Sequence, residues 1–329
     1  MNGIFLTNDS ISYLIAGLFL LLFETLYVHF ARKFNINDKP SLRSSHRVEI
    51  PTGGGVVIFM SVLIFILWHT YMANVTWWTL LLSCGVLTIV SYIDDLNPLP
   101  AESRLMIQVV VIAYVFRTLI HLETFDIFLI ILILGTGLVN AYNFMDGING
   151  MLVAYSTVFL GTIAVYISVY GPSPTATYAP TMFIGLTISL LVAVLILGIF
   201  NFRTKALIFS GDVGSITMGY CVMFIMASTI IHTGNATIIV FLIVYAVDSV
   251  YTILQRLFEG ERITLPHRKH LYQVLVHRRG YSHLAVSTGY AVTQLVINSV
   301  YFLIPATLQW TYVIVVLTSL TFTYFILKH

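Results

Sequence analysis

The chain has 329 residues, of which 58% are hydrophobic and only 9% are charged, and its formal net charge at pH 7 is +2. A soluble domain usually has about one quarter of its residues charged, so this composition excludes an ordinary soluble protein and indicates an integral protein of the lipid bilayer. The small net charge gives no reason to expect a nucleic acid partner.

Eleven apolar runs are long enough to cross the bilayer as helices, by the criterion of roughly 20 residues per span. The first has no Lys or Arg before it and no small-residue cleavage site after it, which favours a retained helix over a signal peptide. We see no repeat or soluble linker and expect one all-α domain over residues 1–329. The expected spans are 11–31, 53–71, 76–93, 105–122, 125–142, 151–170, 180–200, 214–231, 236–257, 287–304 and 308–327.

The basic residues predict the direction of the chain across the membrane. Of the 16 lysines and arginines, all except Arg117 fall on one side or at the inner end of the ninth span if the N-terminus lies outside. Lys and Arg are enriched in cytoplasmic loops, so we expect an outer N-terminus and a cytoplasmic C-terminus. The inner segments are then 32–52, 94–104, 143–150, 201–213, 258–286 and the C-terminal tail.

Five aspartates lie at or near the inner ends of these runs, namely Asp94, Asp95, Asp146, Asp212 and Asp248. A carboxylate near hydrocarbon is costly unless it is paired, solvated or bound to a cation. Magnesium prefers one or two carboxylates together with substrate phosphates, and the glycines of MDGING and SGDVGS permit close approach of the backbone to a ligand. The pattern therefore predicts phosphoryl-group transfer to a lipid phosphate at the inner membrane surface.

The sequence around the aspartates resembles a known family, the polyprenyl-phosphate N-acetylhexosamine-1-phosphate transferases of glycosyltransferase family 4. These enzymes start the assembly of lipid-linked O-antigen of lipopolysaccharide, enterobacterial common antigen, teichoic acid and peptidoglycan. Six blocks occur in the family's order over almost the whole chain. They are DKPSLRSSHRVEIPTGGG (38–55), SYIDDLNPLP (91–100), NAYNFMDGINGM (140–151), FNFRTKALIFSGDVGS (200–215), YAVDSVYTILQR (245–256) and HRKHLYQVL (267–275).

The resemblance implies transfer of a sugar 1-phosphate from a UDP-N-acetylhexosamine to undecaprenyl phosphate, with release of UMP. It also implies a Mg²⁺ cofactor, for which Mn²⁺ is an alternative, a homodimer, and a bacterial inner membrane with the active site on its cytoplasmic face. By position, the catalytic residues are Asp94, Asp95, Asp146 and His270, the metal ligands are Asp212 and Asp146, and the substrate contacts are Asn143, Asn201, Phe209, Arg268, Lys269, Arg43 and His46.

Departures from the family pattern bear on the sugar. Asn149 stands where many members have a second aspartate, His267 replaces another, and Tyr272–Gln273 replaces a pair of histidines. These differences argue against the peptidoglycan branch, and the first and last blocks look most like the branch of O-antigen and capsule initiation. UDP-GlcNAc is the expected nucleotide sugar, and a UDP-linked 6-deoxy-N-acetylhexosamine is the alternative.

Other interpretations of the acidic residues stay open at this point. An ion-coupled transporter would also carry membrane carboxylates, although it would usually place them near the bilayer midplane and show repeats. Asp95 could be only a helix cap. Asp248, Thr252 and Arg256 form an i, i+4, i+8 row on one helix face, so Asp248 has either a structural ion pair or a catalytic role.

Overall fold

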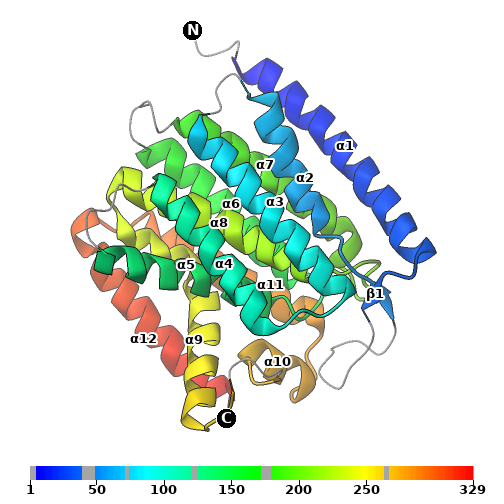
Figure 1. Cartoon of the computed structure of the whole chain (residues 1–329). Helices are drawn as coiled ribbons and strands as arrows, with labels where there is room; N and C mark the ends of the chain where they lie inside the picture. The colour runs from blue at the N-terminus through cyan, green and yellow to red at the C-terminus, as the bar shows by residue number, and fades with distance from the viewer. Residues whose placement is uncertain are drawn as a thin grey trace.

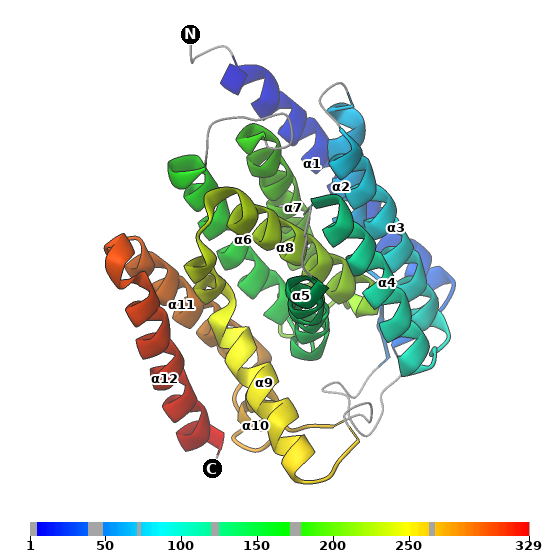
Figure 2. The same cartoon turned by 60° about the vertical axis from the view of Figure 1, so that its left-hand side comes forward.

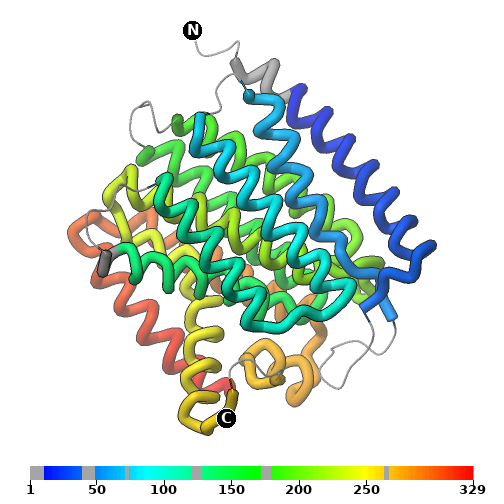
Figure 3. The backbone as a smooth tube through the Cα atoms, in the orientation of Figure 1, coloured from blue at the N-terminus to red at the C-terminus, as the bar shows by residue number. Residues whose placement is uncertain are grey.

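The computed structural model describes residues 5–38, 49–70, 74–119, 125–171, 179–262 and 267–328 (Figure 3). The described segments form an all-α protein whose strands are two residues long and pair as an antiparallel ribbon. The elements are α1 (Phe5–Lys33), β1 (Asn37–Asp38), β2 (Ile50–Pro51), α2 (Val56–Trp68), α3 (Val75–Leu96), α4 (Ala101–Leu119), α5 (Phe125–Met145), α6 (Met151–Tyr170), α7 (Pro180–Asn201), α8 (Gly211–Thr233), η1 (Ala236–Leu242), α9 (Ile243–Phe258), α10 (Leu271–His277), α11 (His283–Tyr301), η2 (Ala306–Leu308) and α12 (Gln309–Lys328).

Helix α8 is the centre of the bundle, and α1 and α12 lie at its periphery (Figures 1 and 2). Of the most apolar stretch of α8, 83% of the residues are buried, against 17% for both α1 and α12. Helices α3 and α5 pack directly on α8 and carry three of the aspartates at or just beyond their C-terminal ends. The core of the bundle therefore holds together the elements that carry the acidic residues.

The outer surface of the bundle is apolar, which is the reverse of a soluble protein. Leu14, Leu18 and Leu22 on α1 and Phe322 on α12 are each more than half exposed. A surface rich in large exposed aliphatic and aromatic side chains is stable against lipid tails and costly in water. The fold is that of an integral membrane protein.

The described part of the chain has eight helices long and apolar enough to cross a membrane by length and composition, and Val56–Trp68 is a shorter apolar helix. Each of the eleven runs expected from the sequence coincides with a helix, the ninth with η1 and α9 in series. The all-α membrane fold is thus confirmed. The count of eleven spans and their direction remain predictions, although the two termini do lie at opposite ends of the bundle (Figure 1).

Two glycines allow the backbones of α2 and α8 to meet at their N-terminal ends. A Cβ atom on Gly55 would overlap the backbone of Gly214, and a Cβ atom on Gly214 would meet the Cα atom of Gly55 at 2.8 Å. Next to this contact, the Gly54 N–H donates to the Phe209 carbonyl at 2.9 Å, and the Gly55 N–H donates to the Ser210 carbonyl at 2.9 Å. The segment after β2 is therefore held by backbone hydrogen bonds against the loop that leads into Asp212.

Candidate active site

Four of the aspartates, Asp94, Asp95, Asp146 and Asp212, line one cavity of about 1200 Å³. The cavity also has an apolar wall on α4 and α5. Several side chains of this wall are also exposed. The wall residues that are both cavity-lining and exposed are Leu105, Leu129 and Ile133.

Asp212 lies in the first turn of α8, where the helix dipole favours a negative charge. Its Oδ2 accepts a hydrogen bond from Arg104 Nη1 at 2.9 Å, and its Oδ1 accepts one from Asn143 Nδ2 at 2.9 Å. The same Asn143 nitrogen donates to Ser215 Oγ at 3.0 Å, which holds the amide in one orientation. Asn143 therefore lies within the acidic cluster, and its contact with substrate remains a prediction.

Asp95 caps α8 from a neighbouring helix. Its Oδ1 accepts from the Asp212 N–H at 2.8 Å and its Oδ2 accepts from the Val213 N–H at 3.1 Å. Gly211, just before these amides, has a φ of +74°, and any side chain there would overlap the Asp95 carboxylate. Asp95 thus fixes the start of α8 and with it the position of Asp212.

Asp146 follows α5 and accepts a hydrogen bond from the Ser210 hydroxyl. Burial is the main cause that raises the pKa of Asp146 to about 8; the Ser210 hydroxyl lowers the pKa and the nearby Asp212 carboxylate raises it by smaller amounts. The carboxyl of Asp146 is therefore largely protonated at neutral pH without a cation. A cation bound beside it would favour the ionised form.

Arg104 is a site residue that the sequence reasoning missed, since it counted there only as a topology determinant. Its guanidinium pairs with both Asp94 and Asp212, and so bridges α3 and α8 from the first turn of α4. The turn Asn97–Pro100 reverses the chain between α3 and α4 and brings Arg104 back over Asp94, whose Oδ1 also accepts the Leu99 N–H at 2.6 Å. A basic residue one helical turn after a proline turn was the available signal.

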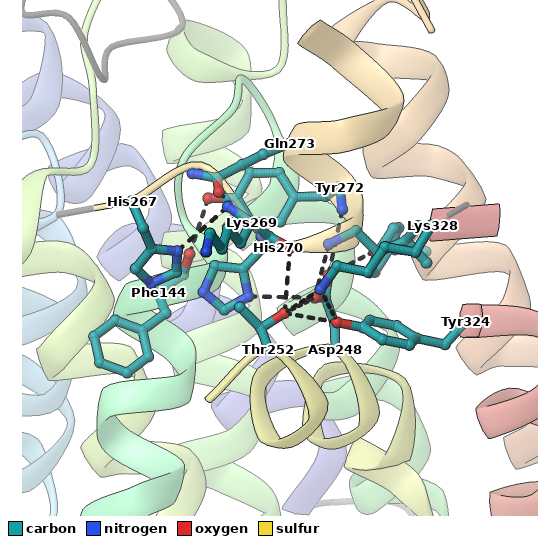
Figure 4. A network of polar contacts seen from close by, with 12 residues as sticks. Phe144, Asp248, Thr252, His267, Lys269, His270, Tyr272, Gln273, Tyr324 and Lys328 are labelled. Atoms are coloured by element: carbon teal, nitrogen blue, oxygen red, sulfur yellow. Dashed lines mark hydrogen bonds and ion pairs between the residues drawn. The ribbon is translucent and has the colours of Figure 1, made fainter. Parts of the chain in front are cut away.

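His270 and His267 line the cavity from the segment before α10. His270 is 2% exposed, and its Nδ1 lies 3.2 Å from Oδ1 of the buried Asp248 on α9 (Figure 4). Burial, with the positive charge of Arg256 nearby, lowers the pKa of His267 to about 4, so this ring is neutral at neutral pH. The two rings are 4.9 Å apart between centroids.

The row of Asp248, Thr252 and Arg256 predicted on α9 forms only part of the contacts that its spacing suggests. Thr252 Oγ1 donates to Asp248 Oδ1 at 3.2 Å, as the i, i+4 spacing suggests. Arg256, in contrast, donates from Nε to Glu261 Oε2 at 3.0 Å. The basic side chain that contacts Asp248 is that of His270, which the sequence did not suggest because 22 residues separate the two.

Asn201 and Phe209 also line the cavity, but the Asn201 amide is engaged with backbone. Its Oδ1 accepts the Gly150 N–H at 2.8 Å, and its Nδ2 donates to the Ile208 carbonyl at 3.1 Å. Asn149 similarly donates to the Arg203 carbonyl at 2.8 Å, which an aspartate carboxylate could not do. These amides shape the loop that carries Phe209, whose own contact with a nucleotide base remains a prediction.

The remaining predicted substrate contacts are not part of the cavity wall as described. The Lys269 ammonium pairs with Glu259 and with Glu261 Oε1, the latter at 2.6 Å, and the Arg268 side chain is exposed. Arg43 and His46 lie outside the described residues. The roles of these four basic residues remain predictions.

The fold and the cavity define a polytopic membrane protein with an acidic site beside an apolar wall, and comparisons with known proteins indicate the family that it resembles. The family model of glycosyl transferase family 4 matches residues 77–230, which span α3 to α8 and include all four aspartates of the cavity. The match covers 154 of the 329 residues, and over this stretch the chain is similar to the family.

Curated relatives match most of the chain. The undecaprenyl-phosphate alpha-N-acetylglucosaminyl 1-phosphate transferase of Escherichia coli (strain K12) is 28% identical over 307 residues, which cover 86% of this chain and 79% of the relative. The enzyme of the same name from Salmonella typhi is 27% identical over 287 residues, covering 80% and 76%. A probable undecaprenyl-phosphate N-acetylglucosaminyl 1-phosphate transferase of Bacillus subtilis (strain 168) is 22% identical over 283 residues, covering 81% and 76%.

Proposed function

We propose that this protein transfers N-acetylhexosamine 1-phosphate from a UDP-sugar, with UDP-GlcNAc as the expected substrate, to undecaprenyl phosphate. UMP is released, and the product starts a lipid-linked cell-envelope polysaccharide. The observation that carries the proposal is the cavity itself, because one continuous space joins four aspartates to an apolar wall on α4 and α5. A phosphate at the acidic end and a prenyl chain along the apolar wall match the two parts of such an acceptor.

The donor set of the cavity fits a hard divalent cation. Among the described residues, no three His, Cys, Asp or Glu side chains form a ready metal cage. Mg²⁺ does not require one, because it is usually bound by one or two carboxylates together with substrate phosphates and water. Asp212 and Asp146 are the proposed ligands, and the bound ion would neutralise charge on the pyrophosphate of the nucleotide sugar.

In the proposed reaction, an oxygen of the lipid phosphate attacks the β-phosphorus of the nucleotide sugar. The bond from that phosphorus to the bridging oxygen breaks, and UMP leaves with the electron pair. Asp94 orients or deprotonates the acceptor, and Asn143 keeps Asp212 in place through its 2.9 Å hydrogen bond. Arg104, already between two carboxylates, is placed to stabilise phosphate charge once a cation occupies the acidic cluster.

Basic groups on the segment before α10 complete the proposed site. His270 would contact the phosphates of the nucleotide sugar, with Arg268 and Lys269 as further contacts. Phe209 and Asn201 would border the uracil ring, and Arg43 and His46 would approach from the segment before β2. The active site would lie on the cytoplasmic face of a bacterial inner membrane, and the protein would act as a homodimer.

The test is a transfer assay with the purified protein, radiolabelled UDP-GlcNAc and undecaprenyl phosphate. We expect labelled lipid and UMP in equal amounts, dependent on added Mg²⁺ and abolished by chelation, with Mn²⁺ as a substitute. Running UDP-linked 6-deoxy-N-acetylhexosamines in parallel identifies the preferred sugar. Absence of lipid product with every nucleotide sugar, or ion-coupled solute uptake in proteoliposomes without UMP release, would refute the proposal.

A further inference from the structure

Asp248 is the best-connected carboxylate of the described residues, and it lies outside the four-aspartate cluster. It is 2% exposed and sits on α9 beneath the first turn of α10. Burying an ionised carboxylate is expensive unless it is paired and hydrogen-bonded, and the partners of Asp248 meet this requirement.

The two oxygens of Asp248 have different partners (Figure 4). Oδ1 lies 3.2 Å from His270 Nδ1 and accepts the Leu271 N–H at 2.9 Å. Oδ2 accepts the Tyr290 hydroxyl at 2.7 Å and the Tyr272 N–H at 3.3 Å. One oxygen therefore orients the imidazole, while the other anchors the carboxylate to α11.

The other ring nitrogen of His270, Nε2, is not used in these contacts. Nε2 is buried and has no hydrogen-bond partner among the described residues, and the ring borders the cavity beside Phe144. Buried polar atoms without a partner are rare in folded proteins and each needs an explanation. A nitrogen kept available at a cavity wall is explained by a ligand group that enters the cavity.

An imidazole presents one nitrogen in a defined protonation state only when the other is held by a partner. A carboxylate on Nδ1 keeps the proton there, directs Nε2 away from itself, and stabilises the imidazolium when it forms. The Tyr272 hydroxyl adds rigidity, because it donates to the Phe144 carbonyl at 2.9 Å and ties the start of α10 to α5.

We propose that Asp248 is the positioning residue for His270, and that it holds the ring so that Nε2 contacts the phosphates of the nucleotide sugar during transfer. This inference rests on the proposed function. Asp248 itself touches no substrate and acts only through His270.

The experiment is a double-mutant cycle of Asp248→Asn and His270→Ala in the transfer assay. The loss of an outer-shell partner costs on the order of 10- to 100-fold in comparable carboxylate–histidine pairs, so we expect Asp248→Asn to lower kcat at least about 10-fold with little change in KM. In the His270→Ala background, Asp248→Asn should have no further effect on kcat, because the group through which it acts is gone.

Tyr290→Phe is the matched control, since it removes one hydrogen bond from Oδ2 and leaves the His270 contact in place. It should keep kcat within about twofold while the thermal midpoint falls, which separates positioning from stability. If Asp248→Asn cannot be purified folded, Asp248→Glu enters the same cycle.

If the double mutant loses kcat by the product of the two single losses, the two residues act independently. That result would overturn the inference and leave Asp248 as a structural cap of α10. A wild-type protein that transfers no sugar phosphate would instead refute the proposed function, so the two failures are distinguishable.

Discussion

The five aspartates at or near the helix ends fall into two regions, which contain the same functional group but surround it with different partners. In the cavity, Asp94, Asp95, Asp146 and Asp212 line one space, and the guanidinium of Arg104 pairs with two of them, Asp94 and Asp212. Beneath α10, Asp248 stands alone and is surrounded by hydroxyl, imidazole and backbone donors.

The difference shows what each region needs. A lone carboxylate with several donors is fully solvated by the protein and requires nothing further. Four clustered carboxylates with one paired cation repel one another, and burial keeps Asp146 protonated until more positive charge arrives. The cavity therefore suits the cation of the proposed function, whereas the donors around Asp248 hold α9, α10 and α11 in place.

The strongest way to break this comparison is to neutralise the cavity cluster. Asp212→Asn and Asp94→Asn should each lower kcat about 1000-fold or more, because each removes a charge that acts on the transferring phosphoryl group. The measurement is initial transfer rate at saturating substrates, with thermal midpoints showing that both variants stay folded. Wild-type turnover in both variants would show that the site has been assigned to the wrong residues.

Arg104 tests whether the guanidinium serves catalysis as well as charge balance. Arg104→Met should lower kcat/KM about 100-fold, the usual effect of removing one preorganised donor from developing oxyanion charge. Arg104→Lys restores the charge without the bidentate fork and should recover part of the loss. Equal rates for Arg104→Met and the wild type would restrict this residue to holding α3, α4 and α8 together.

The Asp248 region should respond in stability rather than in rate to a change remote from His270. Tyr290→Phe removes a hydroxyl that donates to a buried carboxylate, which costs about 1.5–3 kcal/mol in the free energy of unfolding. Chemical unfolding in detergent, followed by intrinsic fluorescence, measures the change. A variant as stable as the wild type would mean that Asp248 does not need its Oδ2 partner.

The smallest effect is expected at Lys269, whose ammonium pairs with two exposed glutamates. Hydrogen bonds from Lys269 hold the pKa values of Glu259 and Glu261 below their ordinary range. Carboxylates with a lowered pKa stabilise the fold above their unfolded pKa, and this contribution is lost as the pH falls through the folded value. The free energy of unfolding of Lys269→Met should therefore be only slightly lower than that of the wild type at neutral pH. In strong acid the two values should be equal.

The same Lys269→Met variant examines a predicted substrate contact. Exposed ion pairs contribute little, so the thermal midpoint should scarcely move. Should the KM for the nucleotide sugar nevertheless rise severalfold, Lys269 must leave its glutamates to reach the substrate, as its place in the HRKH block predicts.

The sequence predicted the helices and the convergence of the acidic residues because both follow from local rules. Apolar runs of about 20 residues have few alternatives to a helix in lipid, and carboxylates at helix ends gather where those ends meet. The bridging position of Arg104 was not predicted, because the proline turn signals a nearby basic residue but not how tightly Asn97–Pro100 turns. The partner of Asp248 was hidden for another reason, since its contact with His270 depends on how α10 docks on α9.

The apolar wall that α4 and α5 give the cavity has a kinetic consequence for the proposed acceptor. A prenyl acceptor that enters along this wall arrives by lateral diffusion within the lipid, so its effective concentration is a mole fraction in a two-dimensional solvent. Turnover in micelles should then fall when detergent is added at constant total acceptor, whereas dilution of the whole sample with matched micelles should leave the rate per enzyme unchanged. If the acceptor enters along this wall, its affinity is properly expressed as a mole fraction in the membrane or micelle and not as a bulk concentration.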